Sequence, residues 1–554
     1  MPVLAASESN FLETELSVVI LLATAALVAV IVRRIRMPYT VALVLAGLGF
    51  AFFPNFLDLD ISSDLILGLL VPPLLFEATL NLPWRKLKAD LVAVLFLALI
   101  GTLVGTFIVG GLVKPLVDVP WPAALAFGAL ISATDPVAVI AFFKTMGVDK
   151  RLTVLVEGES LFNDAIAIVV FNIAIGVAST GDAFSLPDAI REFLVVGFGG
   201  LAVGLVMGAA VSMLLRNLDD HLIETAATLA LAFGSFVVAE EFGEIFGIED
   251  FHLSGILSVV AAGLVVGTMG LTATSPNTRI SLENFWEILT FFVNSMVFLL
   301  IGVEINLLDL RPSLLDVAVA VAAVLVGRFL VVYGIGFVHQ FLQPERAIPK
   351  SYRHVQMWGG LRGAISLALA LTITASDVGS ESTAEVLRLM TFGVVLFTLL
   401  VQGTTMAALI NRLGLSRRSE VEVEQQRRQA ALFAKRAGRR ELVELGNQGV
   451  LLPAMSEALL ATYDDDIKGS SSSLGSHYQR HPELEISMLL QARRTALTAE
   501  QEALLNAGRR GLVSGEIADH QFDALNVQLF ALDLIEERWE LDPAPLDIDG
   551  DPDV

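Results

Sequence analysis

Two polar clusters interrupt stretches of sequence that are otherwise as apolar as a membrane helix. One is Ser-Ala-Thr-Asp-Pro at residues 132–136, and the other is Glu-Ser-Leu-Phe-Asn-Asp at residues 159–164. Asp164 lies within residues 161–174, where every other residue is apolar except two asparagines. A carboxylate at bilayer depth is costly and by default marks a functional site. We therefore interpret Asp164 as a group that carries a cation and a proton in turn.

The polar residues of the second cluster share one helix face. Ser160, Asn163 and Asp164 stand at positions i, i+3 and i+4. Their oxygens, with those of Thr134 and Asp135 opposite, are hard ligands that can replace the water shell of Na⁺ or K⁺. The predicted site contains oxygen ligands only, needs no resident cofactor, and couples two fluxes because a cation and a proton compete for one carboxylate.

Helix-breaking residues stand at two places in the apolar sequence. Pro136 directly follows Thr134 and Asp135 and removes a backbone donor. At residues 358–363, Trp-Gly-Gly-Leu-Arg-Gly, three glycines and Arg362 interrupt a second apolar segment. Irregular backbone at membrane depth is tolerated only where it is buried or lines a cavity. Two interrupted helices in corresponding halves of the chain are typical of a secondary transporter.

The composition favours a membrane as the solvent. Hydrophobic residues make up 55% of the chain and charged residues 17%, and the mean hydropathy is +0.69. We predict an all-α polytopic membrane protein with about thirteen spans of roughly 20 residues. The spans fall near 15–33, 38–54, 64–81, 90–113, 121–144, 150–178, 186–215, 222–241, 252–270, 284–306, 313–341, 351–375 and 383–412. Spans one to six and eight to thirteen would form two inverted repeats that place the two discontinuous helices across from each other.

Basic residues gather in alternate loops, which predicts the orientation of the chain. The loops after the odd-numbered spans contain Arg33, Arg34 and Arg36; Arg85, Lys86 and Lys88; Lys144, Lys150 and Arg151; Arg216; Arg279; Arg346, Lys350 and Arg353; and Arg412, Arg417 and Arg418. The even loops contain only Lys114 and Arg311 as clear exceptions. Because basic loops stay in the cytoplasm, we expect the N-terminus outside the plasma membrane and the C-terminus inside.

Residues 414–554 contain no comparable apolar run, so we predict a helical cytoplasmic tail after a membrane domain at residues 1–413. A Gly-Ser stretch near 468–476 indicates a flexible linker within the tail. A regulatory role is one interpretation of the tail, its partner is unknown, and a passive helix bundle is the alternative. The net charge of −23 is spread over both parts, and the absence of a basic patch excludes a nucleic-acid binder.

Five motifs, in this order, resemble the first monovalent cation:proton antiporter family, which includes bacterial NhaP-like and eukaryotic NHE-type exchangers. They are Phe-Glu-Ala-Thr-Leu-Asn at 76–81, Thr-Asp-Pro at 134–136, Glu-Gly-Glu-Ser-Leu-Phe-Asn-Asp at 157–164, His-Leu-Ser-Gly at 252–255 and Gly-Leu-Arg-Gly-Ala at 360–364. The resemblance covers most of residues 15–413. It implies a secondary active antiporter that exchanges Na⁺, or K⁺ or Li⁺, for H⁺ by alternating access, and it implies a homodimer.

The resemblance also implies roles for the residues of the two clusters. Asp164 resembles the carrier acid of the family, and Asp135, Thr134 and Ser160 resemble the remaining cation-site positions. Asn163 stands where a related electrogenic family has a second aspartate, which implies electroneutral exchange. Asp135 is also a carboxylate, so the sequence alone does not settle that stoichiometry. An acid at a helix break can instead stabilise the start of a half-helix, so both roles of Asp135 stay open.

Three further features carry implied roles. Glu159 and Arg328 resemble a buried ion pair that ties the mobile core together, and Arg362 resembles the arginine at the second helix break. Glu77 and Asn81 resemble a gate pair at i and i+4, although Glu77 follows Pro72-Pro73 and is equally readable as a solvated interfacial residue.

Two other classes of protein fit the sequence less well. A monovalent cation channel would need a continuous pore with several weak sites, whereas paired interrupted helices and one buried acid favour a carrier. A membrane enzyme is disfavoured because the chain has neither a His-Glu-x-x-His zinc motif nor a Gly-x-Ser-x-Gly elbow. The sequence leaves the choice between Na⁺ and K⁺ open, because both ions accept the same oxygen ligands.

Overall fold

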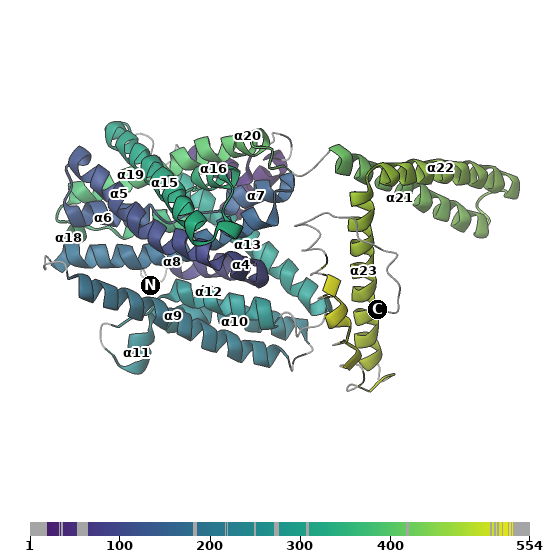
Figure 1. The fold of residues 1–554 in the computed structure, drawn as a ribbon, viewed down its shortest axis with the longest axis horizontal. Coiled ribbons are helices and arrows are strands. Elements are labelled where there is room, and N and C mark those ends of the chain that lie inside the picture. The colour runs from purple at the N-terminus through teal and green to yellow at the C-terminus, as the bar shows by residue number, and fades with distance from the viewer. Residues whose placement is uncertain are drawn as a thin grey trace, which may run out of the picture. The chain divides into compact units, whose positions relative to one another are not determined.

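The structure is a computed structural model of the 554-residue chain. It describes residues 19–535 except 33, 35–36, 52–64, 181–184, 217, 219, 249–250, 271–275, 306–309, 417–419, 510–511, 515–516, 518–519, 523, 530 and 533–534. The chain divides into two compact units, residues 1–417 and 418–554. The described residues of both units are mainly helical, which confirms the predicted all-α class (Figure 1).

The first helices of the membrane unit lead to the first break. They are Val19–Val32, α2 (Tyr39–Ala51), η1 (Leu65–Leu70), α3 (Val71–Leu80), α4 (Trp84–Leu95), η2 (Phe96–Ile100), α5 (Gly101–Val117) and α6 (Trp121–Leu130). After the break follow α7 (Val137–Met146), α8 (Lys150–Thr180), α9 (Leu186–Leu215), α10 (His221–Glu240), α11 (Phe242–Phe246), α12 (Gly255–Val265) and η3 (Val266–Gly270).

The remaining helices of this unit surround the second break. They are α13 (Pro276–Glu304), α15 (Leu314–Leu342), η4 (Pro344–Arg346), α16 (Lys350–Trp358), α17 (Ala364–Thr372), α18 (Ala375–Val378), α19 (Glu381–Phe397), η5 (Thr398–Gly403) and α20 (Thr404–Arg412). Among the described residues, seven helical stretches are long and apolar enough to cross a membrane, and six shorter apolar helices accompany them. Helices occupy all thirteen predicted windows, while the number of actual spans and the inverted repeats remain predictions.

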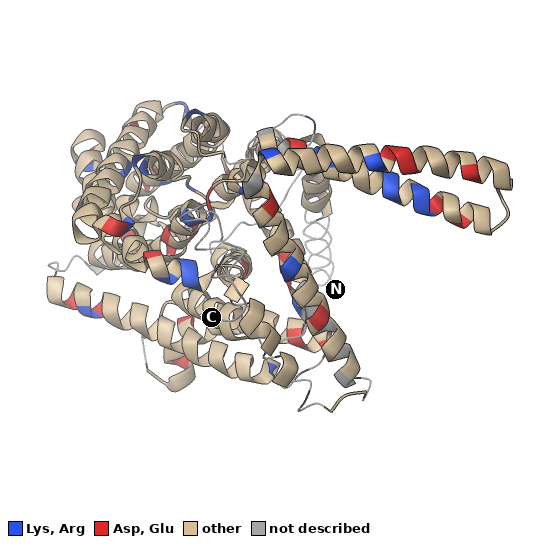
Figure 2. Cartoon of the chain, turned by 45° about the vertical axis from the view of Figure 1, so that its right-hand side comes forward, with Lys and Arg blue, Asp and Glu red and all other residues tan. Residues whose placement is uncertain are grey.

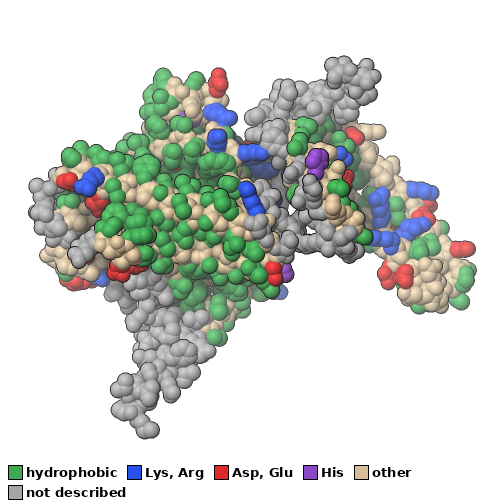
Figure 3. Space-filling model, turned by 90° about the horizontal axis from the view of Figure 1, so that it is seen from below, with side chains coloured by type: hydrophobic (Ala, Val, Ile, Leu, Met, Phe, Trp, Pro, Cys, Tyr) green, Lys and Arg blue, Asp and Glu red, His purple; other side chains and the backbone are tan. Residues whose placement is uncertain are grey.

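The surface of the membrane unit matches an apolar solvent. Phe107, Phe198 and Phe337 are all more than half exposed, a poor arrangement in water but an ordinary one in lipid. Figure 3 shows hydrophobic side chains over most of the visible face of this unit, with few charged groups between them. This surface supports the prediction of a membrane-embedded unit.

Small residues allow helices of this unit to approach closely. α9, α10 and α12 lie side by side (Figure 1). A Cβ atom on Gly204 of α9 would lie 2.0 Å from the carbonyl oxygen of Ser258 on α12, so only glycine fits there. Backbone approach through small residues is a usual way to pack helices where lipid removes the hydrophobic driving force.

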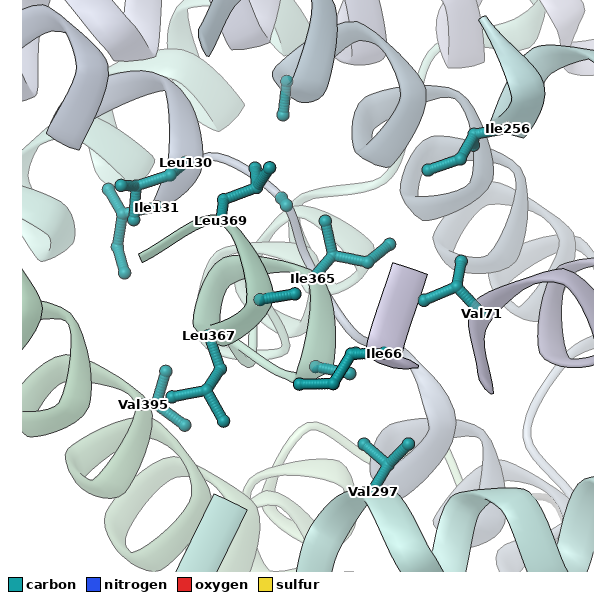
Figure 4. Packing of buried hydrophobic residues seen from close by; sticks show 14 of the residues in the cluster. Ile66, Val71, Leu130, Ile131, Ile256, Val297, Ile365, Leu367, Leu369 and Val395 are labelled. Atoms are coloured by element: carbon teal, nitrogen blue, oxygen red, sulfur yellow. The ribbon is translucent and has the colours of Figure 1, made fainter. Parts of the chain in front are cut away.

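The half-helix α17 lies inside the apolar core of the unit. All seven residues from Ala364 to Ala370 are buried. Leu367 points toward Val395 of α19, while Leu369 lies toward Leu130 at the end of α6 (Figure 4). Because apolar side chains pack around it on several sides, α17 positions the break that precedes it.

The second unit contains a helical hairpin and a third helix. The hairpin consists of α21 (Glu420–Asn447) and α22 (Pro453–Arg480), and α23 (Pro482–Arg509) follows. Both helices of the hairpin contain charged residues (Figure 2), and basic residues of α21 form ion pairs with acidic residues of α22. Two of these pairs are Lys435 with Asp466, at 3.1 Å, and Arg439 with Asp464, at 2.6 Å.

The predicted flexible linker near 468–476 is wrong, because α22 continues through this segment. Arg428 Nη1 on α21 donates to the carbonyl oxygen of Ser473 at 3.0 Å and to its Oγ at 2.7 Å. Glycine and serine have weak helix propensity, but packing against a neighbouring helix supplies most helical stability in proteins. The composition of the segment therefore did not determine its structure.

Candidate functional site

The two helix breaks predicted from the sequence are present, and they contact each other. α6 ends at Leu130 and α7 begins at Val137, so residues 131–136 are not helical. α16 ends at Trp358 and α17 begins at Ala364. The backbone N–H of Asp135 in the first break donates to the carbonyl oxygen of Leu361 in the second, at 2.8 Å. Each break thus satisfies backbone groups that the other leaves free.

Arg362 connects the second break to the end of α6. Its Nη1 donates to the carbonyl oxygens of Ser132, at 2.8 Å, and Ala133, at 3.0 Å, and the side chain is buried. Carbonyls at a helix C-terminus carry partial negative charge, which a cation offsets. Ser366 Oγ also donates to the carbonyl of Leu130, at 2.8 Å. Arg362 therefore lies at the second helix break, as the resemblance implies, and its side chain contacts the end of the half-helix α6.

The structure brings four of the predicted site residues together at the first break. Asp164 Oδ1 accepts from the backbone N–H of Thr134 at 3.0 Å, and Ser160 Oγ donates to the Thr134 carbonyl. Asn163 Nδ2 donates to the Ser132 carbonyl at 2.6 Å and to Thr134 Oγ1 at 3.3 Å. All of these side chains except Ser132 are buried; Asp164 is only 6% exposed. α8 therefore presents these groups to the irregular backbone.

Asp135 has a different arrangement. Its Oδ1 accepts from the backbone N–H of Val137 at 2.9 Å, at the start of α7, which is the helix-stabilising role left open by the sequence. A Cβ atom on Gly363 would lie 2.3 Å from Asp135 Oδ2, so the carboxylate packs directly against the second break. Asp135 also lines the cavity beside Asp164, and the two roles are compatible.

A cavity of about 90 Å³ adjoins the first break. This volume is several times the minimum that holds a water molecule, so a partly dehydrated monovalent cation fits. Its polar lining consists of Thr134, Asp135, Glu157, Ser160, Asp164, Asn294 and Ser366, and the rest of the wall is mostly apolar. Four of the five predicted cation-site residues therefore face one cavity.

Asn163 is the exception among the predicted ligands. It lines a separate cavity of about 30 Å³ together with Arg362. Its Oδ1 accepts from Thr102 Oγ1, and its Nδ2 is used by Ser132 and Thr134. The amide thus holds α5, α8 and the first break together, and it does not face the larger cavity.

Three polar residues of the larger cavity, Glu157, Asn294 and Ser366, have no role in the sequence interpretation. Glu157 belongs to the motif at residues 157–164, but the sequence analysis gives it no function. It precedes Asp164 by seven residues and therefore lies on the same helix face, so the spacing alone could have indicated that it lines the same cavity. Asn294 on α13 also lines the cavity, and no motif marked it.

Glu159 and Arg328 form the predicted ion pair. Arg328 Nη1 contacts Glu159 Oε1, and both side chains are almost fully buried. Arg328 Nε and Nη2 also donate to the carbonyl oxygen of Gln356, at 3.2 and 2.9 Å, close to the second break. One guanidinium therefore joins α8, α15 and α16.

Glu77 in the last turn of α3 forms a pair with Asn81, the residue that caps the end of this helix. Asn81 Nδ2 donates to Glu77 Oε1 at 2.8 Å. Neither residue lines the cavity beside Asp164. Glu77 interacts electrostatically with Lys144 and Glu287. The assignment of Glu77 and Asn81 as a gate remains a prediction.

Membrane-type helices, two broken helices in contact and buried carboxylates at a cavity define a polytopic membrane protein with a polar cavity in its core. The sequence pattern described as "Sodium/hydrogen exchanger, transmembrane" matches residues 19–412. The chain belongs to the sodium/hydrogen exchanger family, and it is a multi-pass membrane protein.

Named relatives support this assignment. The Na⁺/H⁺ antiporter ApNhaP of Aphanothece halophytica is 35% identical over 87% of this chain and 90% of that protein. The Na⁺/H⁺ antiporter NhaG of Bacillus atrophaeus is 33% identical over 89% and 93%. The solved sodium proton antiporter MjNhaP1 from Methanocaldococcus jannaschii has a similar fold, with a TM-score of 0.60 and 22% identity over 72% of this chain and 99% of that chain.

Proposed function

We propose that the chain is a secondary active antiporter that exchanges Na⁺ for H⁺, with Asp164 as the shared carrier group; K⁺ or Li⁺ are further candidate cations. The observation that carries the proposal is the cavity in which the Asp164 carboxylate meets Thr134, Asp135 and Ser160. Membership of the sodium/hydrogen exchanger family and relatives named as Na⁺/H⁺ antiporters support the choice of ions. No cofactor takes part in the proposed cycle.

Burial of Asp164 supplies a physical reason for coupling. An ionised carboxylate removed from water is unfavourable unless a partner neutralises it. A proton on Asp164 supplies that neutralisation, and so does a Na⁺ held by Asp164, Ser160 Oγ and the Thr134 carbonyl. The empty ionised site has neither. If the site opens to the opposite face of the membrane mainly when Asp164 holds a proton or a Na⁺, each crossing carries one of these ions, and the protein exchanges one for the other.

The electroneutral stoichiometry follows from the neutral residue beside Asp164. Asn163 adds no charge, so the site is equally charged with one Na⁺ or one H⁺ on Asp164. Asp135 is a second carboxylate in the cavity, but its hydrogen bond to the Val137 N–H at the start of α7 favours a fixed structural charge. We therefore propose one Na⁺ for one H⁺.

The contacts around the breaks support a moving core. Arg362 bonds the two breaks, and the Glu159–Arg328 pair joins α8 to α15. These links favour movement of the breaks as one body, which carries the cavity from one side to the other, as in alternating access. Glu77 and Asn81 are proposed as a gate on α3.

The arrangement in the cell is proposed from the charges of the loops. The basic residues of alternate loops support an N-terminus outside and a C-terminus in the cytoplasm. The plasma membrane is proposed as the location. The family supports a homodimer as the assembly. Residues 414–554 are proposed as a regulatory cytoplasmic tail, whose partner is unknown.

Proton flux in proteoliposomes containing a pH dye tests the function. We expect Na⁺ pulses to drive proton movement in the wild type, to fail in Asp164→Asn, and to work normally in Asp188→Asn, a matched control at an exposed residue of α9. The flux should be insensitive to a clamped membrane potential. Equal fluxes in wild type and Asp164→Asn would remove Asp164 as carrier, and a Na⁺ current without proton movement would indicate a channel.

A further inference from the structure

A second carboxylate of α8 faces the same cavity as Asp164. Glu157 and Asp164 are seven residues apart, so they lie on one helix face about 10 Å apart along the axis. Asp164, Asp135 and Glu159 each accept a hydrogen bond from the protein. Among the residues that the structure describes, no hydrogen bond or ion pair holds the Glu157 carboxylate. It is therefore available to a mobile ligand.

Glu157 lies between Asp164 and one end of α8. The helix begins at Lys150, seven residues before Glu157. Ser160 and Leu161, which lie between Glu157 and Asp164 in sequence, also line the cavity. An ion that moves along α8 from this end therefore passes Glu157 before it reaches Asp164. In the proposed orientation this is the cytoplasmic end.

Lys144 places a flexible positive charge near this carboxylate. It lies on α7, its side chain is exposed, and it interacts electrostatically with both Glu157 and Glu77. Among the described residues it forms no ion pair with an acid. A lysine ammonium is a compact charge on a flexible stem, so it attracts the carboxylates without occupying them permanently.

We propose that Glu157 is a transient cation-binding group at the α7/α8 entrance of the cavity, and that the Lys144 ammonium competes with the incoming monovalent cation for it. This proposal rests on the proposed antiport function and extends it to one face of the membrane. The apparent cation affinity at that face then depends on both residues. The affinity at the opposite face depends on Asp164 and its neighbours alone.

Vesicles of defined orientation test the proposal, with Na⁺ titrated at one face at a time. We expect Glu157→Gln to raise the half-saturating Na⁺ concentration at the α8-start face about three- to tenfold, where tenfold corresponds to about 1.4 kcal/mol. The opposite face and the maximal rate should be unchanged. Glu157→Asp should restore most of the affinity, because it retains the charge.

Lys144→Met should have the opposite effect, a half-saturating concentration lower by about two- to fivefold at the same face, because a nearby like charge is removed. Its control is Lys150→Met, which removes an exposed charge at the first residue of α8. In Glu157→Gln, adding Lys144→Met should have little further effect, because the two residues act on the same step.

Three results distinguish a failure of the proposed antiport function from a failure of the proposed entrance. Absent Na⁺-driven flux in the wild type overturns the antiport function itself. Normal wild-type flux with unchanged constants in Glu157→Gln and Lys144→Met overturns only the entrance. Equal shifts at both faces also overturn it, since Glu157 would then act on the shared site. Should Glu157→Gln fail to accumulate, the sided effect of Lys144→Met decides alone.

Discussion

Arg362 Nη1 donates to the carbonyl oxygen of Ser132 at 2.8 Å, across 230 residues of sequence. This bond joins the second helix break to the first, on the side of α6. The backbone bond from Asp135 to Leu361 joins the same breaks on the side of α7. The geometry of the cavity therefore depends on both breaks, so changes in the second break should affect cation binding at the first.

Gly363→Ala tests this dependence. The added Cβ would lie 2.3 Å from Asp135 Oδ2, so the Asp135 carboxylate or the break has to shift. Overpacking of this kind costs about 1–3 kcal/mol, and we expect transport to fall by at least tenfold. Gly334→Ala is the matched control, because nothing lies within 4 Å of its Cβ. Normal Na⁺-driven proton flux in Gly363→Ala would show that the break tolerates displacement.

Ser160→Ala tests the cation ligands. The substitution removes a hydroxyl that lines the cavity and bonds the Thr134 carbonyl. The loss of one such interaction is worth about 1 kcal/mol, or roughly fivefold in affinity. We expect the half-saturating Na⁺ concentration to rise by that factor at both faces of the membrane. Ser235→Ala, which removes a buried hydroxyl of α10 outside the cavity, should leave it unchanged. A change in maximal rate alone would argue for a structural role of Ser160.

The helix breaks show what the sequence could predict about the site. Pro136 and the glycines before Ala364 disrupt helices through backbone chemistry that acts locally, so both breaks were predictable. The orientation of Asn163 was not. Positions i+3 and i+4 share a face in sequence, but the Thr102 hydroxyl on α5 bonds Asn163 and turns it from the cavity that Asp164 lines. The direction in which the Asn163 side chain points therefore depends on a contact with a neighbouring helix.

Glu157 illustrates a second limit. Its spacing from Asp164 was visible, but a carboxylate near the end of a predicted span is as readily solvated as functional. Only the packing of α3, α13 and α17 around α8 encloses it in a cavity. The sequence therefore shows which acidic residues lie in the predicted spans, and the tertiary structure determines which of them line one cavity.

The Glu159–Arg328 pair predicts non-additive effects on stability. Removing one partner of a buried pair leaves an uncompensated charge and costs about 3–5 kcal/mol. We expect Glu159→Gln and Arg328→Met each to lower the thermal stability of the detergent-solubilised protein strongly. The double variant should lose less than the sum of the two, because the residues share one interaction. Additive losses would show that each residue is held mainly by other groups, such as the Gln356 carbonyl for Arg328.

The tail hairpin should weaken in acid. The Arg439 guanidinium, which donates to Asp464 Oδ1 at 2.6 Å, lowers the pKa of Asp464 below its ordinary value of 3.8. The folded carboxylate binds protons less readily than the unfolded one, so its contribution to stability is complete above the ordinary pKa and is lost as the pH falls through the lowered one.

Amide hydrogen exchange of the full chain measures this effect. Above the ordinary pKa of Asp464, for example at pH 6, the wild type should protect the amides of α22 better than Asp464→Asn does. As the pH falls below 3.8, this difference should shrink, because protonation of Asp464 removes the same charge that the substitution removes. Intrinsic exchange rates cancel in a comparison at each pH. Asp465→Asn is the control, since within the described part of the tail the ion pair of Asp465 is a loose one with Lys468, at 4.0 Å, and both side chains are largely exposed. A difference of the same size at both pH values would show that the Arg439–Asp464 pair does not stabilise the hairpin through its charge.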